Sequence, residues 1–325
     1  MIAVGALPFR PGERAELLIP ARVAGRTADG TTWLTEVHPR DGHDVTPREV
    51  EAFERPSRFL VSTLQSRTRW CTEVLAALEA ITAGDLEKVV LAREVMVEAD
   101  VPFSRHDVLA RLVESQPDCF VYAADAMVGA TPELLISRQG DSVTCLPMAG
   151  TVARAGDDGT RVSALEHSHK DRREHRLVVD AMVRALRTRC DGVHADNAPS
   201  LARLADVVHL ATRIVGTVRE PAPSSLDLAR LLSPTPAIAG APRDAALEFL
   251  ARLEPFERGC YGGPVGWVDA RGDGEWAVAL RGAELDRRRA RLVAGAGIVA
   301  GSDPDAEWAE TEAKLSAMLR VLVTP

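Results

Sequence analysis

The stretch GAGIVAGSDPDAEWAETEAKL, residues 295–315, decides the architecture of the C-terminal end of the chain. Its first half alternates small and apolar residues as a strand does, and Gly301 with Ser302 then breaks the strand. The residues that follow predict a closing helix over 303–322, whose apolar stripe is formed by Trp308, Leu315, Met318 and Leu319. The fold is therefore expected to end with a strand, a glycine-rich turn and a helix.

Three charged residues share one face of that closing helix. Glu307, Glu310 and Lys314 are spaced i, i+3 and i+7, so their side chains project within about two turns of one another. Such a row is usually a solvated face. Here Lys314 is the neighbour of Leu315 in the apolar stripe, so part of the row must border the buried side. The glycine turn before the helix would also let backbone approach a ligand closely.

Length and composition exclude several classes of protein. The chain has 325 residues, of which 46% are hydrophobic, so it can bury a large core without disulfides. Lys and Arg number 39 against 47 Asp and Glu, and the formal charge of −8 argues against nucleic acid or an anionic membrane as a partner. The five cysteines are odd in number and form no CxxC pair, which favours a reducing compartment. No stretch approaches the roughly 20 apolar residues of a membrane span. We therefore expect a cytoplasmic protein, and separately we expect it to be a monomer.

The order of predicted elements indicates an α+β fold rather than an alternating parallel sheet. The first 60 residues contribute short strands and turns at an edge of the fold. Helices are predicted over 67–83, 107–114, 169–189, 226–232, 243–253 and 303–322. Strands are predicted over 88–97, 119–123, 126–130, 133–138, 142–148, 206–218, 262–269, 275–286 and 291–298.

The long middle helix carries a second pair of acids. Asp171 and Glu174 lie in its first turns, where carboxylates also favour the helix dipole without any function. Two helices that each present a carboxylate pair could instead meet across a cleft and hold a hard divalent cation such as Mg²⁺. Zinc is a weaker alternative, because the nearby histidines lack a third ligand at a recognisable spacing; they are His167, His169 and His175.

Two more ionisable residues stand at the ends of apolar strands. Lys88 opens the strand KVVLARE, and Glu133 follows a proline-fixed turn in ATPELL. A lysine in this place is most often solvated, but one removed from water beside a second cation could act as a base.

Common nucleotide and hydrolase motifs do not occur. The glycines Gly295, Gly297 and Gly301 are spaced GxGxxxG rather than GxGxxG, and no acidic residue follows at the distance that a dinucleotide fold requires. A P-loop, a GxSxG elbow and an HExxH pair are absent as well.

A series of ordered blocks from about residue 75 to the C-terminus resembles the chorismate-utilising enzymes, the family of isochorismate synthases, salicylate synthases, anthranilate synthase large subunits and aminodeoxychorismate synthases. The blocks are KVVLAR (88–93), GATPELL (129–135), MAGT (148–151), KDRREH (170–175), VHL (208–210), PTPA (234–237), CYGGPVGW (260–267), ALR (279–281), GAGI (295–298) and GSDP with EWAETEAKL (301–315). The PTPA block, the following GAPR (240–243) and Lys88 together look like an isochorismate synthase specifically.

The resemblance implies a fold and a domain organisation. It predicts an α+β fold of the anthranilate synthase component I type, in which two β-sheets pack together with helices on the outside. Residues 1–325 would form a single chorismate-binding domain, with a core over 75–325 that carries all the motifs and an N-terminal edge segment over 1–60.

The resemblance also implies a reaction, in which chorismate is isomerised to isochorismate by addition of water at C2 and loss of the C4 hydroxyl. Lys88 would be the general base that activates the water, and Glu133 the general acid that protonates the departing hydroxyl. These roles require a neutral lysine and a protonated glutamate at the moment they act.

The family pattern further implies Mg²⁺ as the cofactor. Glu174 and Glu310 match the metal ligands, and Asp171 and Glu307 the outer pair that contacts metal-bound water. Asp171 stands where Glu is more usual, which shortens its reach by one methylene.

The remaining substrate contacts follow from the same resemblance. The cation, Gly150 and Thr151 would meet the ring carboxylate, and His209 would lie near the ring. The pyruvyl carboxylate would be bound by the side chains of Arg281, Lys314 and Tyr261 and by the backbone around Gly295 and Gly297.

Three alternatives stay open at this point. A salicylate synthase would form isochorismate and then eliminate pyruvate, although the PTPA block speaks against it. An amino-transferring member is less consistent with a lysine at position 88, since it would occupy the route of ammonia. A chorismate-binding homologue without turnover is the third, because Ser233 replaces the histidine that usually precedes PTP and the N-terminal part is short. The product would serve a siderophore, menaquinone or salicylate-derived pathway.

Overall fold

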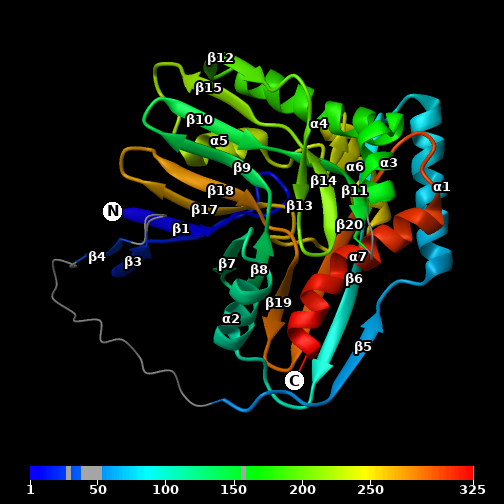
Figure 1. Cartoon of the computed structure of the whole chain (residues 1–325), viewed down its shortest axis with the longest axis horizontal. Coiled ribbons are helices and arrows are strands. Elements are labelled where there is room, and N and C mark those ends of the chain that lie inside the picture. Colours follow the sequence, from blue (N-terminus) through cyan, green and yellow to red (C-terminus); the bar gives the residue numbers. More distant parts are fainter. Residues whose placement is uncertain (27–30, 38–52, 155–158, 325) are drawn as a thin grey trace.

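Antiparallel strand pairing organises the molecule into two large β-sheets, which Figure 1 shows in the computed structural model. The structure describes residues 1–26, 31–37, 53–154 and 159–324. The first sheet has eight strands in the spatial order β12 (Cys190–Ala195), β15 (Ile214–Val218), β10 (Ser142–Leu146), β9 (Leu134–Gln139), β18 (Gly274–Val278), β17 (Pro264–Asp269), β1 (Ile2–Ala6) and β2 (Leu17–Leu18).

The second large sheet has seven strands and contains the longest strand of the described chain. Its order is β16 (Gly240–Ala241), β6 (Lys88–Ala99), β20 (Arg289–Ile298), β19 (Gly282–Asp286), β8 (Met127–Thr131) and β7 (Phe120–Ala124), and β5 (Phe59–Thr63) also pairs with β6. The long pair β6 and β20 runs in register from Glu98 opposite Arg289 to Val89 opposite Ile298. Strand β6 therefore fixes Lys88 beside the glycine-rich end of β20.

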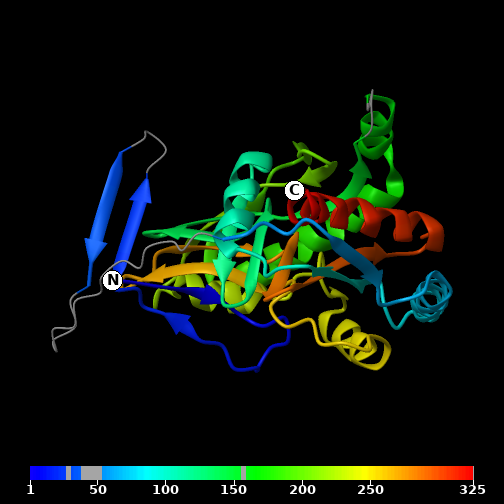
Figure 2. The ribbon, with the colours of Figure 1, turned by 90° about the horizontal axis from the view of Figure 1, so that it is seen from below.

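Two smaller sheets accompany the large ones. One has three strands, β11 (Met148–Ala153), β14 (Val207–Ala211) and β13 (Ser200–Arg203). The other is the hairpin β3 (Arg22–Arg26) and β4 (Thr32–Glu36), which stands apart from the sheets in Figure 2. The predicted α+β architecture of two large sheets with outer helices is confirmed.

Seven helices are present in the described residues and lie around the sheets. They are α1 (Arg67–Ala83), α2 (Arg105–Ser115), α3 (Gly159–His167), α4 (His169–Leu186), α5 (Ser225–Leu232), α6 (Arg243–Leu253) and α7 (Pro304–Val323). Helix α7 packs on β20, and α4 packs on β11 and β12. None of these helices combines the length and the apolar character that a membrane crossing needs.

The two helices that matter most for the site have clear sequence causes. Helix α7 begins where the Asp303 carboxylate accepts a hydrogen bond from the Ala306 amide at 2.9 Å, with Pro304 in the first turn. Helix α4 begins where the Ser168 hydroxyl accepts from the Asp171 amide at 3.2 Å. Each helix then buries an apolar stripe, so its remaining face is free to present acids to the neighbouring sheet.

The core is continuous across the sheets. Trp276 of β18 and Leu91 of β6 belong to one cluster of buried side chains although they come from different sheets. Trp70 of α1 packs edge to face with Trp308 of α7 at 6.1 Å between ring centroids. Helices and both sheets are thus held by a shared core.

Several predicted strands prove to be two strands in different sheets. The predicted strand 206–218 is divided at Thr212 and Arg213 into β14 and β15, and 275–286 is divided after Val278 into β18 and β19. The predicted strand 142–148 ends at Leu146, and β11 starts at Met148. The patterns failed here because apolar residues continue through each crossing, so periodicity shows no boundary.

Other elements were not predicted. These include α3, β12, β13 and the two-residue β16, and both β12 and β13 are short strands rich in exposed residues. At the N-terminus, β1 and β2 form the edge of the eight-stranded sheet, where β1 pairs with β17. Residues 27–30 and 38–52 of the predicted edge segment lie outside the described residues.

Candidate active site

A cavity opens where the chain crosses between sheets. The crossing from β8 to β9 contributes Glu133, and the crossing from β18 to β19 contributes Arg281. The start of β11 contributes Gly150 and Thr151, and β20 and α7 close the other side. Polar and apolar side chains from several elements thus converge on one cavity, as they do in sites for small organic ligands.

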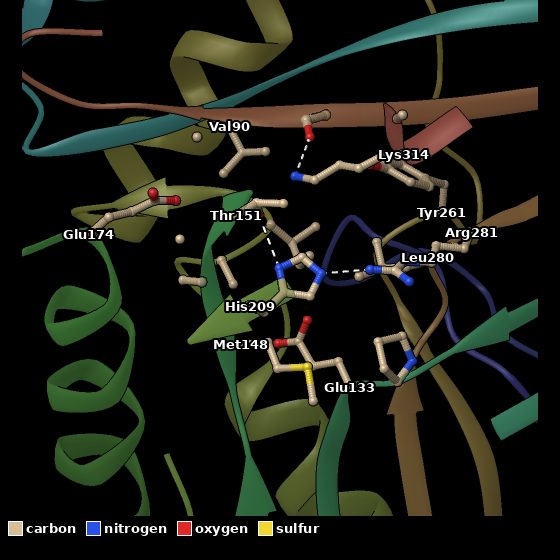
Figure 3. A pocket seen from close by; sticks show the side chains of 18 of the residues that line it. Val90, Glu133, Met148, Thr151, Glu174, His209, Tyr261, Leu280, Arg281 and Lys314 are labelled. Atoms are coloured by element: carbon tan, nitrogen blue, oxygen red, sulfur yellow. Dashed lines mark hydrogen bonds between the residues drawn. The ribbon is translucent and has the colours of Figure 1, made fainter. Parts of the chain in front are cut away.

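The structure gathers most of the predicted site residues around this one cavity. Those that line it are Glu133, Gly150, Thr151, Glu174, His209, Tyr261, Arg281, Gly295, Gly297 and Lys314. Lys88, Asp171, Glu307 and Glu310 are not in the lining. Figure 3 shows Glu133 below the His209 ring and Glu174 on another side of the cavity.

Lys88 lies directly behind Glu174. The lysine is fully buried, and its Nζ is 2.8 Å from Glu174 Oε1, at an orientation that does not satisfy a hydrogen bond. Burial alone would raise the pKa of Glu174, but the charge and close approach of Lys88, together with the charges of Lys314 and Lys170, hold that pKa below its ordinary value. Gly297 makes room for this pair, because a Cβ there would collide with the Glu174 carboxylate and come within 2.9 Å of Lys88 Cε.

Glu133 occupies a dry position at the end of the crossing from β8. Its side chain is buried, and burial raises its pKa to about 7, although the Met148 amide and the charges of Lys88, Lys314 and Arg281 lower it in part. Near neutral pH, Glu133 can therefore carry a proton and donate it.

Arg281, His209 and Thr151 form a row of polar contacts along the wall. Arg281 Nη2 is 2.6 Å from His209 Nε2, and His209 Nδ1 is 3.0 Å from Thr151 Oγ1. Arg281 adopts the left-handed conformation, with φ of 49°, at the crossing from β18 to β19. A residue other than glycine in this region is uncommon and here turns a guanidinium into the cavity.

Lys314 reaches the cavity from α7. Its Nζ donates to the Gly295 carbonyl at 2.9 Å and is 2.7 Å from Glu310 Oε1. Burial lowers the pKa of Lys314, but Glu310, Tyr261 and Glu174 together outweigh it, so the net shift is upward. Burial also raises the pKa of Tyr261, which lines the cavity beside Gly295. Lys314 and Arg281 thus give the cavity two positive groups.

Of the four acids predicted to bind a metal, three form an ion pair with a lysine, namely Glu174, Glu307 and Glu310. The fourth, Asp171, lies beside these pairs. Lys170 Nζ donates to Glu307 Oε1 at 2.7 Å, which adds a third lysine to those already bound to Glu174 and Glu310. Burial raises the pKa of Asp171 and of Glu310. Among the described residues, no three side chains of His, Cys, Asp or Glu gather closely enough to hold a metal ion.

The histidines weighed for zinc are not brought together. His175 is buried, contacts the Thr212 hydroxyl at 2.6 Å and has a pKa lowered to about 4, chiefly by burial. His167 is exposed and donates to the Ser163 carbonyl at 2.8 Å. Because these histidines lie in separate environments, they do not form a zinc site together.

Sequence reasoning missed two kinds of residue. Lys170 stands in the block KDRREH but received no role, although its ion pair with Glu307 could be suspected from opposite charges on two helices expected to meet. The apolar wall was also missed, and it consists of Val90, Met148, Ala149, Ala237, Ile238, Leu280 and Val293 with neighbouring residues. No sequence signal separates these from ordinary core residues.

Ser233, the departure from the family pattern, is not part of this cavity. It lies with residues 7–13 and Arg230 around a different hollow, and its carbonyl accepts from Arg243 at 3.3 Å. The serine at position 233 therefore changes no side chain that lines the cavity, and it gives no direct reason for a loss of turnover.

Comparison with known proteins places these observations in a family. A family profile described as "Chorismate binding enzyme" matches residues 22–323. The chain is 37% identical to isochorismate synthase EntC of Escherichia coli (strain K12), over 98% of this chain and 81% of that protein. It is 35% identical to isochorismate synthase DhbC of Bacillus subtilis (strain 168), over 99% of this chain and 80% of that protein. The solved structure of MenF, the menaquinone-specific isochorismate synthase from Escherichia coli, matches with a TM-score of 0.86 and 29% identity, over 99% of this chain and 79% of that one.

Proposed function

Because the chain belongs to the chorismate binding enzyme family, we propose that it is an isochorismate synthase that converts chorismate to isochorismate. Its similarity to proteins named isochorismate synthases over nearly the whole chain supports this assignment. The observation that carries it in the structure is a buried carboxylic acid, Glu133, in a cavity that also holds Arg281 and Lys314. A proton donor beside two cations suits a ligand that has carboxylates and a hydroxyl to be lost.

In the proposed reaction, the chain's own residues move two protons. Lys88, in its neutral form, takes a proton from the water that adds at C2. Glu133 gives a proton to the C4 hydroxyl, which leaves as water while the ring double bonds shift. One water enters and one leaves, so the reaction is an isomerisation without redox change. Each positioned proton transfer can contribute about 10² to 10⁴ in rate.

Substrate orientation would come from two anchor points. Arg281 and Lys314 meet the pyruvyl carboxylate, and Arg281 keeps free N–H donors beyond the one that faces His209. Thr151, at the other end of the row that begins with Arg281, and the backbone at Gly150 meet the ring carboxylate. Two fixed anions define the position of C2 and C4 relative to the two proton-transfer groups.

We also propose Mg²⁺ as the cofactor, held by Glu174 and Glu310 with Asp171 and Glu307 outside them. The donor set is made of carboxylate oxygens, which Mg²⁺ prefers, and the charges of Glu174 and Glu307 act on Glu310. When bound, Mg²⁺ would polarise the ring carboxylate and take up charge as the diene rearranges. Glu174 would share its carboxylate between the cation and Lys88, whose Nζ lies 2.8 Å from Glu174 Oε1.

Product analysis tests the proposal. Purified protein is incubated with chorismate and Mg²⁺, and the products are separated by chromatography. Isochorismate alone is expected. Salicylate with pyruvate would instead identify a salicylate synthase, and unchanged chorismate would support a binding protein without turnover.

Two variants make that experiment specific. Lys88→Ala should abolish turnover while chorismate binding stays measurable, because the lysine lies behind the lining and not in it. Ser233→Ala is the matched control and should keep near-normal activity, since Ser233 lies outside the cavity. Near-normal activity of Lys88→Ala would remove the lysine from the mechanism.

A further inference from the structure

In the row of Arg281, His209 and Thr151, the chemistry of each group determines which atom donates and which accepts in the two hydrogen bonds. The three residues come from the crossing before β19, from β14 and from β11, and Thr151 and His209 are direct partners on neighbouring strands. Figure 3 shows both contacts of the imidazole as dashed lines, one to each neighbour. The ring is therefore held at both nitrogens.

The guanidinium fixes which ring nitrogen carries the proton. Arg281 has N–H donors and no acceptor, so the His209 Nε2 that faces it at 2.6 Å must be the acceptor. A neutral imidazole has one N–H, which must then be on Nδ1. An imidazolium would point an N–H at the guanidinium and is excluded by the same contact. Burial, with the charges of Arg281 and Lys314, lowers the pKa of His209 well below its ordinary value, in agreement with a neutral ring.

This tautomer also determines the donor and the acceptor in the hydrogen bond between His209 and Thr151. The Nδ1–H donates to Thr151 Oγ1 at 3.0 Å, so this hydroxyl oxygen acts as an acceptor toward the histidine. Within the described chain, the Thr151 hydroxyl forms no other hydrogen bond, and the residue lines the cavity. Its own proton is therefore available to a group inside the cavity that can accept it.

We propose that His209 is a positioning residue: as the Nδ1–H tautomer, it turns the Thr151 hydroxyl so that it donates to an anionic oxygen of the bound ligand. This inference rests on the proposed function, in which that oxygen belongs to the ring carboxylate of chorismate. His209 takes no proton in the reaction, because its Nε2 lone pair is occupied by Arg281.

The tautomer can be measured without any turnover. In protein labelled with ¹⁵N at the histidine rings, the resonances of His209 are assigned from their loss in His209→Gln. We expect Nδ1 protonated and Nε2 unprotonated, without titration between about pH 6 and 8. A proton on Nε2, or an imidazolium in that range, would overturn the proposal. This result stands even if the protein does not isomerise chorismate, so the two failures can be told apart.

Two substitutions separate the two ring nitrogens. In His209→Asn, a side-chain amide N–H can stand where Nδ1–H stood and donate to Thr151. In His209→Gln, the amide reaches only the Nε2 position beside Arg281. We expect His209→Gln to raise KM for chorismate by about tenfold or more, the loss of a hydrogen bond to a charged group, and His209→Asn to restore most of it.

The partner residue provides the matching test. Thr151→Val removes the hydroxyl at nearly constant shape and should raise KM as much as His209→Gln, with no further loss in the double variant. Thr151→Ser, which keeps the hydroxyl, should stay within about threefold of the wild type. Additive losses would contradict a shared pathway, as would equal losses in the Asn and Gln variants. Circular dichroism establishes that each variant is folded.

Discussion

Glu133 illustrates how one residue's surroundings define its chemistry. An exposed glutamate would be ionised at neutral pH, but this carboxyl lies at a crossing between sheets, away from water, and its pKa rises to about 7. Its folded pKa lies above the ordinary value of 4.5, so ionisation costs the folded state. The contribution of Glu133 to stability therefore becomes less favourable as pH rises from about 4.5 to about 7.

The first prediction concerns the pH dependence of activity. As the proposed general acid, Glu133 must be protonated, so kcat/KM for chorismate should fall about tenfold per pH unit above about 7. Stopped assays across pH 5 to 9 would measure this limb. Glu133→Gln should reduce activity by about 10² to 10⁴ and remove the limb. A wild-type profile that stays level up to pH 9 would contradict the assignment.

The second prediction concerns Gly297, where the missing side chain is what matters. An added Cβ would collide with the Glu174 carboxylate and come within 2.9 Å of Lys88 Cε, so Gly297→Ala must displace the ends of these side chains. We expect kcat to fall about tenfold or more, with a stability loss of only about 1 kcal/mol, because flexible side-chain ends can move. Steady-state kinetics and thermal melting measure the two effects.

A surface glycine serves as the control for that substitution. Unlike Gly297, Gly192 has a positive φ, of 60°, and an added Cβ there would meet no atom within 4 Å. Gly192→Ala should therefore cost stability through backbone strain while activity stays unchanged. If both variants lose activity equally, the effect at Gly297 is not local crowding.

At the scale of elements, Arg93 fastens α7 to β6. Its side chain is buried, its Nε donates to Thr311 Oγ1 at 2.6 Å, and the guanidinium carbon lies 3.8 Å from the centre of the Trp308 ring. This contact connects the strand that begins with Lys88 to the helix that carries Lys314. The relative position of two groups in the site thus depends on one arginine outside it.

The third prediction follows from that contact. Arg93→Met should lower the free energy of unfolding by about 2 to 4 kcal/mol through loss of a hydrogen bond to a buried partner and of the cation–π contact. Urea denaturation measures the change. Arg289→Met is the matched control on the adjacent strand, where a largely exposed ion pair with Glu98 at 3.0 Å should contribute less than about 1 kcal/mol. Comparable losses in the two variants would refute an anchoring role.

The elements also reveal what could be predicted from the sequence. The helix 67–83 was predicted with its bounds, because Gly84 ends it in the left-handed conformation and the apolar spacing is regular. The strand 206–218 was wrong as a single strand, because Val, Ile and Ala continue on both sides of Thr212 and Arg213. A change of sheet leaves no mark on hydrophobic periodicity, so only the three-dimensional structure could locate it.

The candidate site divides in a similar way. Charged and glycine residues could be named from motifs, and most of them line one cavity. The apolar wall could not, since Met148 and Ile238 look like any core residue in the sequence. The pair of Lys170 and Glu307 could only be suspected from their opposite charges, because the two residues are far apart along the chain and meet only when α4 and α7 do.

For the whole molecule, the cavity depends on both sheets at once. Glu133 and Arg281 sit on separate crossings between them, and the shared core joins Trp276 of one sheet to Leu91 of the other. Neither sheet can therefore come apart without displacing a residue of the cavity.

The fourth prediction is that structure and activity are lost together. In urea, tryptophan fluorescence, far-ultraviolet circular dichroism and residual activity should give one coincident transition, because the buried tryptophans Trp70 and Trp276 belong to the shared core. Activity that disappears well before either optical signal would indicate that the crossings loosen independently of the sheets.

The ion pairs between acids and lysines have a consequence for the stability of the protein without its proposed cation. Lys88, Lys170 and Lys314 each neutralise one acid of the proposed Mg²⁺ site, so these acids have internal counterions. Folding should then be independent of chelation. As a fifth prediction, the melting temperature in excess EDTA should match that in metal-free buffer and rise only modestly when Mg²⁺ is added.

Unfolding of the protein by EDTA would show instead that the lysines do not balance the acids. Where they do, the polypeptide differs from small zinc domains, for which metal binding and folding are one event. The protein is then fully folded without a bound cation, and it can be made, purified and stored in that form. The proposed cation would then be needed for activity, while folding would depend on the chain alone.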